Sequence, residues 1–219
     1  MIIRVTGARN EACNIETIVG FTPMTSLIST PISPELRVSG IGDGAAALLG
    51  ALSVKPSELD ESDVAIFCVS ANHGVTPSEQ ELWAHARELY VPSLVVITDL
   101  DSSEIDFDDM SAIAGRLLDP VVTPYLVLHS DDGTPAALID LDALKIHEMQ
   151  NGVSQIRESD SEHKVLVFEF RKEYLEALEA AGEGAFEQGL LYPALPWIRE
   201  SGIGLPEIAQ YLQLLPSRS

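Results

Sequence analysis

Six acidic residues lie close together in the middle of the chain, where their carboxylates could bind a cation. Calcium loops present carboxylate oxygens at alternating positions, but they also require a glycine at the sixth position and a glutamate at the twelfth. Acidic side chains equally favour the first turn of a helix, because they interact with its dipole. We therefore interpret the run as the solvated start of a helix, with a calcium site as the alternative. The residues are Asp99, Asp101, Glu104, Asp106, Asp108 and Asp109.

The histidines and cysteines do not form a pattern typical of a catalytic or metal site. The five histidines are scattered without metal-ligand spacing. His129, Ser130 and Asp131 are adjacent in sequence, which indicates a hairpin tip, since a catalytic triad is assembled in space. Two cysteines, Cys13 and Cys68, make no disulfide framework and fit a reducing cytoplasm. The sequence therefore predicts no catalytic residue and no metal ligand.

The chain carries a large negative charge. Its 219 residues include 34 acidic and 13 basic side chains, which gives a net charge of −21. Such a field repels phosphate backbones, so we expect no direct binding to nucleic acid. No apolar run reaches the length of about 18 residues that a membrane helix needs, so we expect a cytoplasmic protein without membrane contact. Solubility, or adaptation to a salty or acidic-proteome cell, explains the charge, and a partner with a basic surface is the alternative.

The order of apolar runs predicts strands that alternate with helices. Residues 64–69 and 94–98 are short continuous apolar runs, as in strands buried on both faces. Between them, residues 78–90 have apolar side chains at helical spacing, and Ser78 is the expected N-cap. This succession predicts a mainly parallel sheet covered by helices.

Further elements are expected on both sides of this centre. A strand is expected at residues 2–6, and helices at 45–54, 106–118, 173–186 and 206–214. Strands are also expected at residues 124–128, 136–141 and 164–170, with a mobile polar loop at 151–163.

Residues 70–101 contain a framework of glycine, proline and tryptophan positions, and they end in Thr98-Asp99-Leu100-Asp101. This framework resembles the nucleotide domain of elongation factor G and its relatives among the translational GTPases, where the last four residues read Asn-Lys-x-Asp. The resemblance extends to residues 136–148 and 204–217, which are similar to the inserted subdomain and to the end of that nucleotide domain. The framework positions are Ala71, Gly74, Val75, Pro77, Glu81, Trp83, Val91 and Pro92.

The resemblance implies a P-loop-NTPase-like α/β fold, with a mainly parallel sheet flanked by helices and an inserted α+β subdomain. Residues 1–130 and 190–219 would form the GTPase-like domain, and residues 131–189 the inserted subdomain. In the family, this subdomain contacts a ribosomal stalk protein. The resemblance therefore implies a protein partner in the translation machinery.

The segment that would be the phosphate loop begins at Gly7 and has lost most of its nucleotide-binding groups. The motif G-x-x-x-x-G-K-[ST] supplies backbone amides and a lysine to the phosphates and a hydroxyl to Mg²⁺. Here Ala12 replaces the second glycine, Cys13 replaces the lysine and Asn14 replaces the hydroxyl residue. Arg9 could compensate only in part, because its spacing differs from that of the lysine.

The family's second magnesium motif, Asp-x-x-Gly followed by a histidine, is also incomplete. Its nearest counterpart is Asp43 in the segment 40–44, which has neither the glycine three residues later nor the neighbouring histidine. We expect a flexible surface turn at this place.

The guanine-reading residues are replaced as well. Asp101 could still accept hydrogen bonds from the base, but Thr98 and Asp99 stand where the asparagine and lysine would be. The backbone clip on the guanine oxygen would fall at residues 196–198, where proline has no amide and Trp197 could fill the base pocket.

These substitutions predict a pseudo-GTPase that binds or regulates a partner, with no cofactor and no GTP hydrolysis. Its vestigial nucleotide site would consist of Gly7, Arg9, Cys13, Asn14, Thr98, Asp99 and Asp101. The alternative is an atypical nucleotide-binding protein that holds GTP and Mg²⁺ in a rearranged site with Arg9, Asp43 and Asp101. A third interpretation is a structural module whose acidic face pairs with a basic partner.

Overall fold

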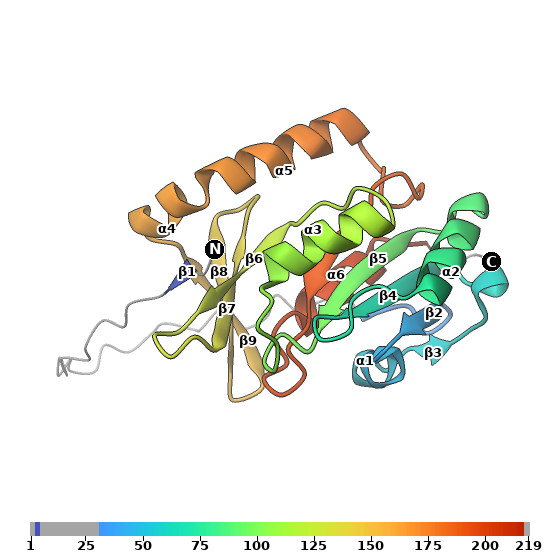
Figure 1. Ribbon diagram of the computed structural model, residues 1–219, viewed down its shortest axis with the longest axis horizontal. Coiled ribbons are helices and arrows are strands. Elements are labelled where there is room, and N and C mark those ends of the chain that lie inside the picture. Colours follow the sequence, from blue (N-terminus) through green and yellow to red (C-terminus); the bar gives the residue numbers. More distant parts are fainter. Residues whose placement is uncertain (1–2, 5–30, 217–219) are drawn as a thin grey trace, which may run out of the picture.

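Two five-stranded sheets organise the computed structural model, which describes residues 3–4 and 31–216 (Figure 1). The first sheet is parallel, in the order β10-β5-β4-β2-β3. Its strands are β2 (Arg37–Gly42), β3 (Lys55–Pro56), β4 (Val64–Ser70), β5 (Ser93–Thr98) and β10 (Ala194–Pro196). Every residue of β4 and β5 is buried, so the two expected central strands and the parallel α/β fold class are confirmed.

Helices cover both faces of the parallel sheet. On one face lie α2 (Pro77–Glu88) and α3 (Phe107–Leu117), and on the other α6 (Leu205–Gln213) packs beside α1 (Ala45–Leu52) (Figure 1). All four helices were expected from the sequence to within a few residues. The first N-cap was wrongly assigned, because Thr76 rather than Ser78 caps α2 in a reciprocal capping box with Glu79.

The second sheet is mainly antiparallel, in the order β1-β6-β7-β8-β9. A meander of β6 (Tyr125–His129), β7 (Pro135–Asp140), β8 (Lys145–Gln150) and β9 (Val153–Glu158) forms its body, and β1 (Ile3–Arg4) adds in parallel to β6. The helices α4 (Ser161–Leu166) and α5 (Phe168–Ala181) follow, and α5 packs Tyr174 and neighbours onto the core of this sheet. The short 3₁₀ helix η1 (Leu59–Glu61) precedes β4.

The sequence-based interpretation was wrong at two places in this part of the chain. Residues 151–163 are not a loop, because residues 153–158 form the strand β9. All six residues of β9 are exposed, so the strand lacks the alternation of buried and exposed side chains that would identify it in the sequence. Residues 164–170 are not a strand but the end of α4 and the start of α5. Their apolar side chains Val165, Leu166 and Phe168 are exposed, so the apparent alternation does not reflect burial.

The segment 40–44 is also more ordered than the expected flexible turn, since 40–42 are the last residues of β2. The expected division into residues 1–130 with 190–219 and residues 131–189 stays a prediction. One relevant observation is that β6, which precedes residue 131, pairs with β1 and β7 in the antiparallel sheet.

Candidate functional site

The carboxyl ends of β2, β4, β5 and β10 meet at one edge of the parallel sheet. In open α/β sheets, ligands bind in the crevice outside this edge. Four loops form it here, at residues 42–44, 70–76, 98–106 and 197–204. The candidate site is therefore built from these loops, and it includes Thr98, Asp99 and Asp101.

Asp99 is held inside the edge by hydrogen bonds to two hydroxyl groups. Its Oδ2 accepts from Ser70 Oγ at 2.6 Å and from Thr98 Oγ1 at 3.2 Å. Its backbone φ of 60° lies in the left-handed region, which aspartate and asparagine tolerate better than most residues. Where the related motif has a lysine, the chain thus places a carboxylate that is bound to its own neighbours.

Further hydrogen bonds join the β5–α3 loop to the loop after β4. Asn72 Nδ2 donates to Ser102 Oγ at 3.0 Å, and Ser103 Oγ donates to the carbonyl oxygen of Ala71 at 3.3 Å. Asp101 is exposed beside this network. The structure therefore brings Thr98 and Asp99 together and leaves the Asp101 carboxylate facing solvent.

The β2–α1 connection requires its glycines. Gly42 has a φ of 94°, and a Cβ at this position would collide with the carbonyl oxygen of Cys68 and with Oε1 of Glu79. Gly44, with a φ of 84°, is the N-cap of α1 and offers no side-chain cap. Asp43, between them, lies with its Oδ2 3.4 Å from His73 Nδ1, and both side chains are more than two-thirds exposed.

A basic residue at the edge was missed by sequence reasoning. Trp197 follows β10 and is 3% exposed, and the guanidinium of Arg199 lies 5.3 Å from the centre of its ring. A Cβ added at Gly44 would lie 3.5 Å from Arg199 Nη2, so Arg199 reaches towards the start of α1. The sequence offered one indication of its role, because Arg199 directly follows residues 196–198, the segment aligned with the base clip.

The thiol of Cys68, close to the carboxyl end of β4, is unreactive. Burial raises the pKa of Cys68 to about 12, so the thiol stays protonated near neutral pH and is a poor nucleophile.

The structure supports the interpretation of the acidic run as a helix start. Asp106 is the N-cap residue of α3, and Asp108 and Asp109 lie in its first turn. Within residues 3–4 and 31–216, no group of three or more histidine, cysteine or acidic side chains is arranged to hold a metal ion. The other predicted nucleotide contacts, Gly7, Arg9, Cys13 and Asn14, lie outside the described residues.

Comparisons with known proteins agree with this architecture, although no family model matches the chain. The elongation factor G-like protein of Mycobacterium tuberculosis is 27% identical over 176 residues, which cover 69% of this chain and 24% of that protein. GTPase Der of Vibrio campbellii is 32% identical over 96 residues, 34% of this chain and 19% of the relative.

A solved crystal structure of a protein from Thermus thermophilus gives a TM-score of 0.63 at 30% identity, over 73% of this chain and 27% of that one. The chain thus spans about a quarter or less of the length of each of these relatives. The resemblance to the nucleotide domain of elongation factor G-like GTPases is confirmed. In the described part of the chain, no helix has both the length and the apolar character needed to cross a membrane.

Proposed function

We propose that this chain is a pseudo-GTPase, a GTPase-like domain that does not hydrolyse GTP and acts as a binding or regulatory module. The observation that supports this best is the position of Asp99. Its carboxylate replaces the lysine of the guanine-reading motif and accepts hydrogen bonds from Ser70 and Thr98. A side chain that is engaged in this way is not available to brace a base.

The substitutions in the phosphate loop point in the same direction. Cys13 and Asn14 stand where a lysine and a magnesium-binding hydroxyl would be. Charge-assisted hydrogen bonds contribute about 1.5–3 kcal/mol each. The loss of three or four such contacts would turn a micromolar binder into one of about millimolar affinity.

Titration of the protein with mant-GTP in the presence of Mg²⁺ tests the proposal, together with a phosphate-release assay. We expect a dissociation constant of about 1 mM or weaker and no release of phosphate above the level of buffer alone. Low-micromolar affinity, or turnover that depends on the protein, would contradict it.

The alternative, an atypical nucleotide-binding protein with a rearranged site, is favoured by Arg199. This side chain places a positive charge beside the uncapped start of α1, where a phosphate group could bind. If this alternative holds, GTP raises the melting temperature and the substitution Arg199→Gln removes that shift. If the chain is a pseudo-GTPase, GTP gives no shift in either protein.

The link to translation rests on the relatives, and we extend it to residues 136–186 as the partner-binding part. The alignment covers only 24% of the elongation factor G-like protein, so the partner is a proposal. Crosslinking in cell extract followed by mass spectrometry should recover ribosomal proteins or translation factors through lysines of this segment, such as Lys164 and Lys172. Crosslinks that involve no component of translation would count against the link.

A further inference from the structure

Three apolar side chains are exposed where the end of α2 meets the loop that follows α5. Leu89 and Tyr90, directly after α2, are 39% and 68% exposed, and Leu190 in that loop is 54% exposed. The two segments are in contact, because a Cβ added at Gly189 would lie 3.1 Å from the carbonyl oxygen of Tyr90. We call Leu89, Tyr90 and Leu190 the Tyr90 patch. It lies near the amino ends of β4 and β5, opposite to the sheet edge that holds the nucleotide-site residues.

Tyr90 occupies a position at which helices usually have glycine. Its amide donates to the carbonyl oxygen of Arg87 at 3.1 Å, and the amide of Val91 donates to that of Ala86 at 3.0 Å, which is the Schellman ending of a helix. The φ of Tyr90 is 54°, and a bulky residue is strained in this region. Because the ring is mostly exposed, burial within the fold does not offset the strain. Such strain is concentrated at functional sites, so it points to a role for the exposed ring.

The base of the patch is held together by Arg87. Its Nη1 donates to the carbonyl oxygen of Gly189 at 3.0 Å, its guanidinium lies 4.5 Å from the centre of the Tyr192 ring, and its Nε lies 3.0 Å from Asp119 Oδ2. These contacts join α2, the segment after α3 and the loop before β10. A surface that is ordered in advance loses less entropy when a partner binds.

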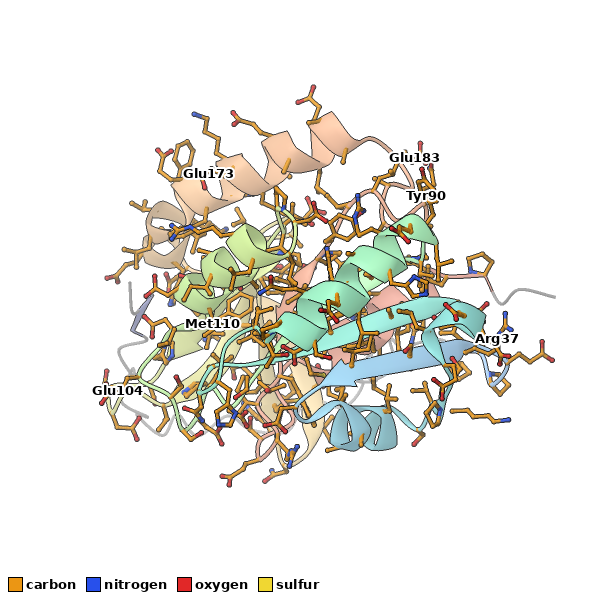
Figure 2. All side chains as sticks on the ribbon, turned by 45° about the vertical axis from the view of Figure 1, so that its right-hand side comes forward. Arg37, Tyr90, Glu104, Met110, Glu173 and Glu183 are labelled. Atoms are coloured by element: carbon orange, nitrogen blue, oxygen red, sulfur yellow. The ribbon has the colours of Figure 1, made fainter. Side chains whose placement is uncertain are left out.

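The rim of the patch is acidic. Glu88 directly precedes Leu89, Glu183 and Glu187 lie in the loop after α5, and all three glutamates are exposed. No described residue forms a hydrogen bond or an ion pair with the carboxylate of Glu183 or Glu187. Figure 2 shows Tyr90 and Glu183 at the same end of the molecule.

The positive charges nearby do not cancel this rim. Arg87 is paired with Asp119, as described above. His85 Nδ1 lies 3.9 Å from Glu88, but its Nε2 lies closer, at 2.6 Å, to Asp60. Arg116, in the last turn of α3, adds one positive charge, which is less than the charge of Glu183 and Glu187 together.

The charge decides which class of partner fits the patch. A second copy of this chain carries the same net charge of −21, and nucleic acids and anionic membranes are negative as well. All three are repelled by an acidic rim, whereas a positively charged protein segment is attracted.

We propose that the Tyr90 patch binds a basic segment of a partner protein, in which apolar side chains are flanked by lysine or arginine. The apolar side chains pack on Tyr90, Leu89 and Leu190, and the basic side chains face Glu183 and Glu187. Tyrosine is among the residues that contribute most to binding at protein interfaces. The inference goes beyond the proposed function, because it depends neither on the loss of GTP hydrolysis nor on the strands and helices within residues 136–181.

NMR titration of the labelled protein tests the proposal, with the peptide acetyl-Lys-Leu-Lys-Lys-Leu-Lys-amide as the probe. At low ionic strength we expect the amide signals of Leu89, Tyr90 and Leu190 to shift with a dissociation constant of about 50–500 μM. High salt should weaken binding by about tenfold. Matched peptides with glutamine in place of lysine, or serine in place of leucine, should bind at least about fivefold more weakly.

Tyr90→Gly separates binding from folding. Glycine adopts the positive φ of this position without strain, so the melting temperature should stay the same or rise. Peptide binding should nevertheless weaken by about tenfold, because the aromatic contact is absent. A glycine variant that binds the peptide as tightly as the unaltered protein would overturn the proposal.

A matched set of charge variants separates the patch from general attraction to an acidic protein. Glu183→Gln combined with Glu187→Gln should weaken peptide binding by about three- to tenfold. Glu104→Gln combined with Glu173→Gln removes the same charge at exposed places that lie well apart from Tyr90 in Figure 2, and it should leave the affinity unchanged.

Equal effects of the two double variants, or no peptide-dependent shift in the Tyr90 patch, would contradict the proposal. Shifts of the same signals on dilution without peptide would indicate a second copy as the occupant, and they would contradict it as well.

Discussion

At the scale of single residues, Asp99 combines a backbone φ of 60° with a carboxylate that accepts two hydroxyl hydrogen bonds. Asp99→Asn keeps a side chain that tolerates this backbone and can still accept from Ser70. Asp99→Lys loses the acceptor and leaves the Ser70 hydroxyl without its partner. We expect losses in unfolding free energy of about 0.5–1 kcal/mol for asparagine and 2–3 kcal/mol for lysine, measured by urea denaturation. A lysine variant as stable as the unaltered protein would refute this role.

Asp108, in the first turn of α3, gives a pH dependence of a defined sign. Burial, reinforced by the charges of Asp106 and Asp109, raises its pKa from 3.8 to about 6. The folded state therefore binds more protons than the unfolded state between these values, and its stability falls as the pH rises from about 4 to 6. Asp108→Asn removes this effect.

We therefore expect the Asp108→Asn variant to be more stable than the unaltered protein by about 1–2 kcal/mol above pH 6, and the difference to shrink below pH 4. Chemical denaturation at pH 4, 5, 6 and 7.5 measures it. A constant difference at all four values would show that Asp108 does not titrate in this range.

At the scale of elements, the start of α2 depends on Thr76 rather than on the residue that the sequence suggested. Thr76 Oγ1 accepts from the Glu79 amide at 3.3 Å, and the Glu79 carboxylate accepts from the Thr76 amide at 2.7 Å. Thr76→Ala should reduce the unfolding free energy by about 1 kcal/mol. Ser78→Ala is the matched control and should change it by less than about 0.3 kcal/mol, because alanine suits a helix interior. Comparable losses in both variants would contradict the assigned cap.

The strands that were predicted from the sequence and the strand that was missed differ in how far their residues are buried. Residues 64–69 and 94–98 are buried on both faces, so hydrophobicity alone identifies them. By contrast, β9 is an exposed edge strand, and its pairing with β8 depends on a turn at Asn151 and Gly152, both with positive φ. Only Asn-Gly, a frequent hairpin turn, could have indicated it.

The same distinction applies to the candidate site. Thr98 and Asp99 could be placed at the sheet edge because Thr98 ends a recognisable buried strand and Asp99 directly follows it. Arg199 could not, since its approach to Gly44 depends on how the loop after β10 folds over the start of α1. His129 had been predicted only as part of a hairpin tip, and nothing in the sequence indicated that its Nδ1 is buried without a hydrogen bond to the described residues.

At the scale of the whole molecule, a buried polar pair joins the two sheets. His147 on β8 and Glu207 on α6 are separated by 60 residues, yet His147 Nδ1 lies 2.7 Å from Glu207 Oε1. Their side chains are 8% and 3% exposed. A second carboxylate, that of Asp140, has its Oδ2 4.0 Å from His147 Nε2. The His147 imidazole thus adds a polar contact between the antiparallel sheet and the helical layer of the parallel sheet, beside the apolar core that Tyr125 and Leu138 share with α6.

The two single substitutions, at His147 and at Glu207, should therefore lower the unfolding free energy by different amounts. His147→Leu leaves the carboxylates of Glu207 and Asp140 in a buried place without the imidazole, so we expect a loss of about 3–5 kcal/mol in unfolding free energy. Glu207→Leu leaves His147 with Asp140 nearby, and the loss should be smaller, about 2–3 kcal/mol. In the double variant both polar groups are absent, so its loss should be clearly less than the sum of the two.

Urea denaturation of the four proteins, followed by tryptophan fluorescence and by far-UV circular dichroism, measures this coupling. Additive losses would mean that the pair does not stabilise the junction. If the fluorescence and circular dichroism transitions have different midpoints in the single variants, the two sheets unfold together only while this pair is intact.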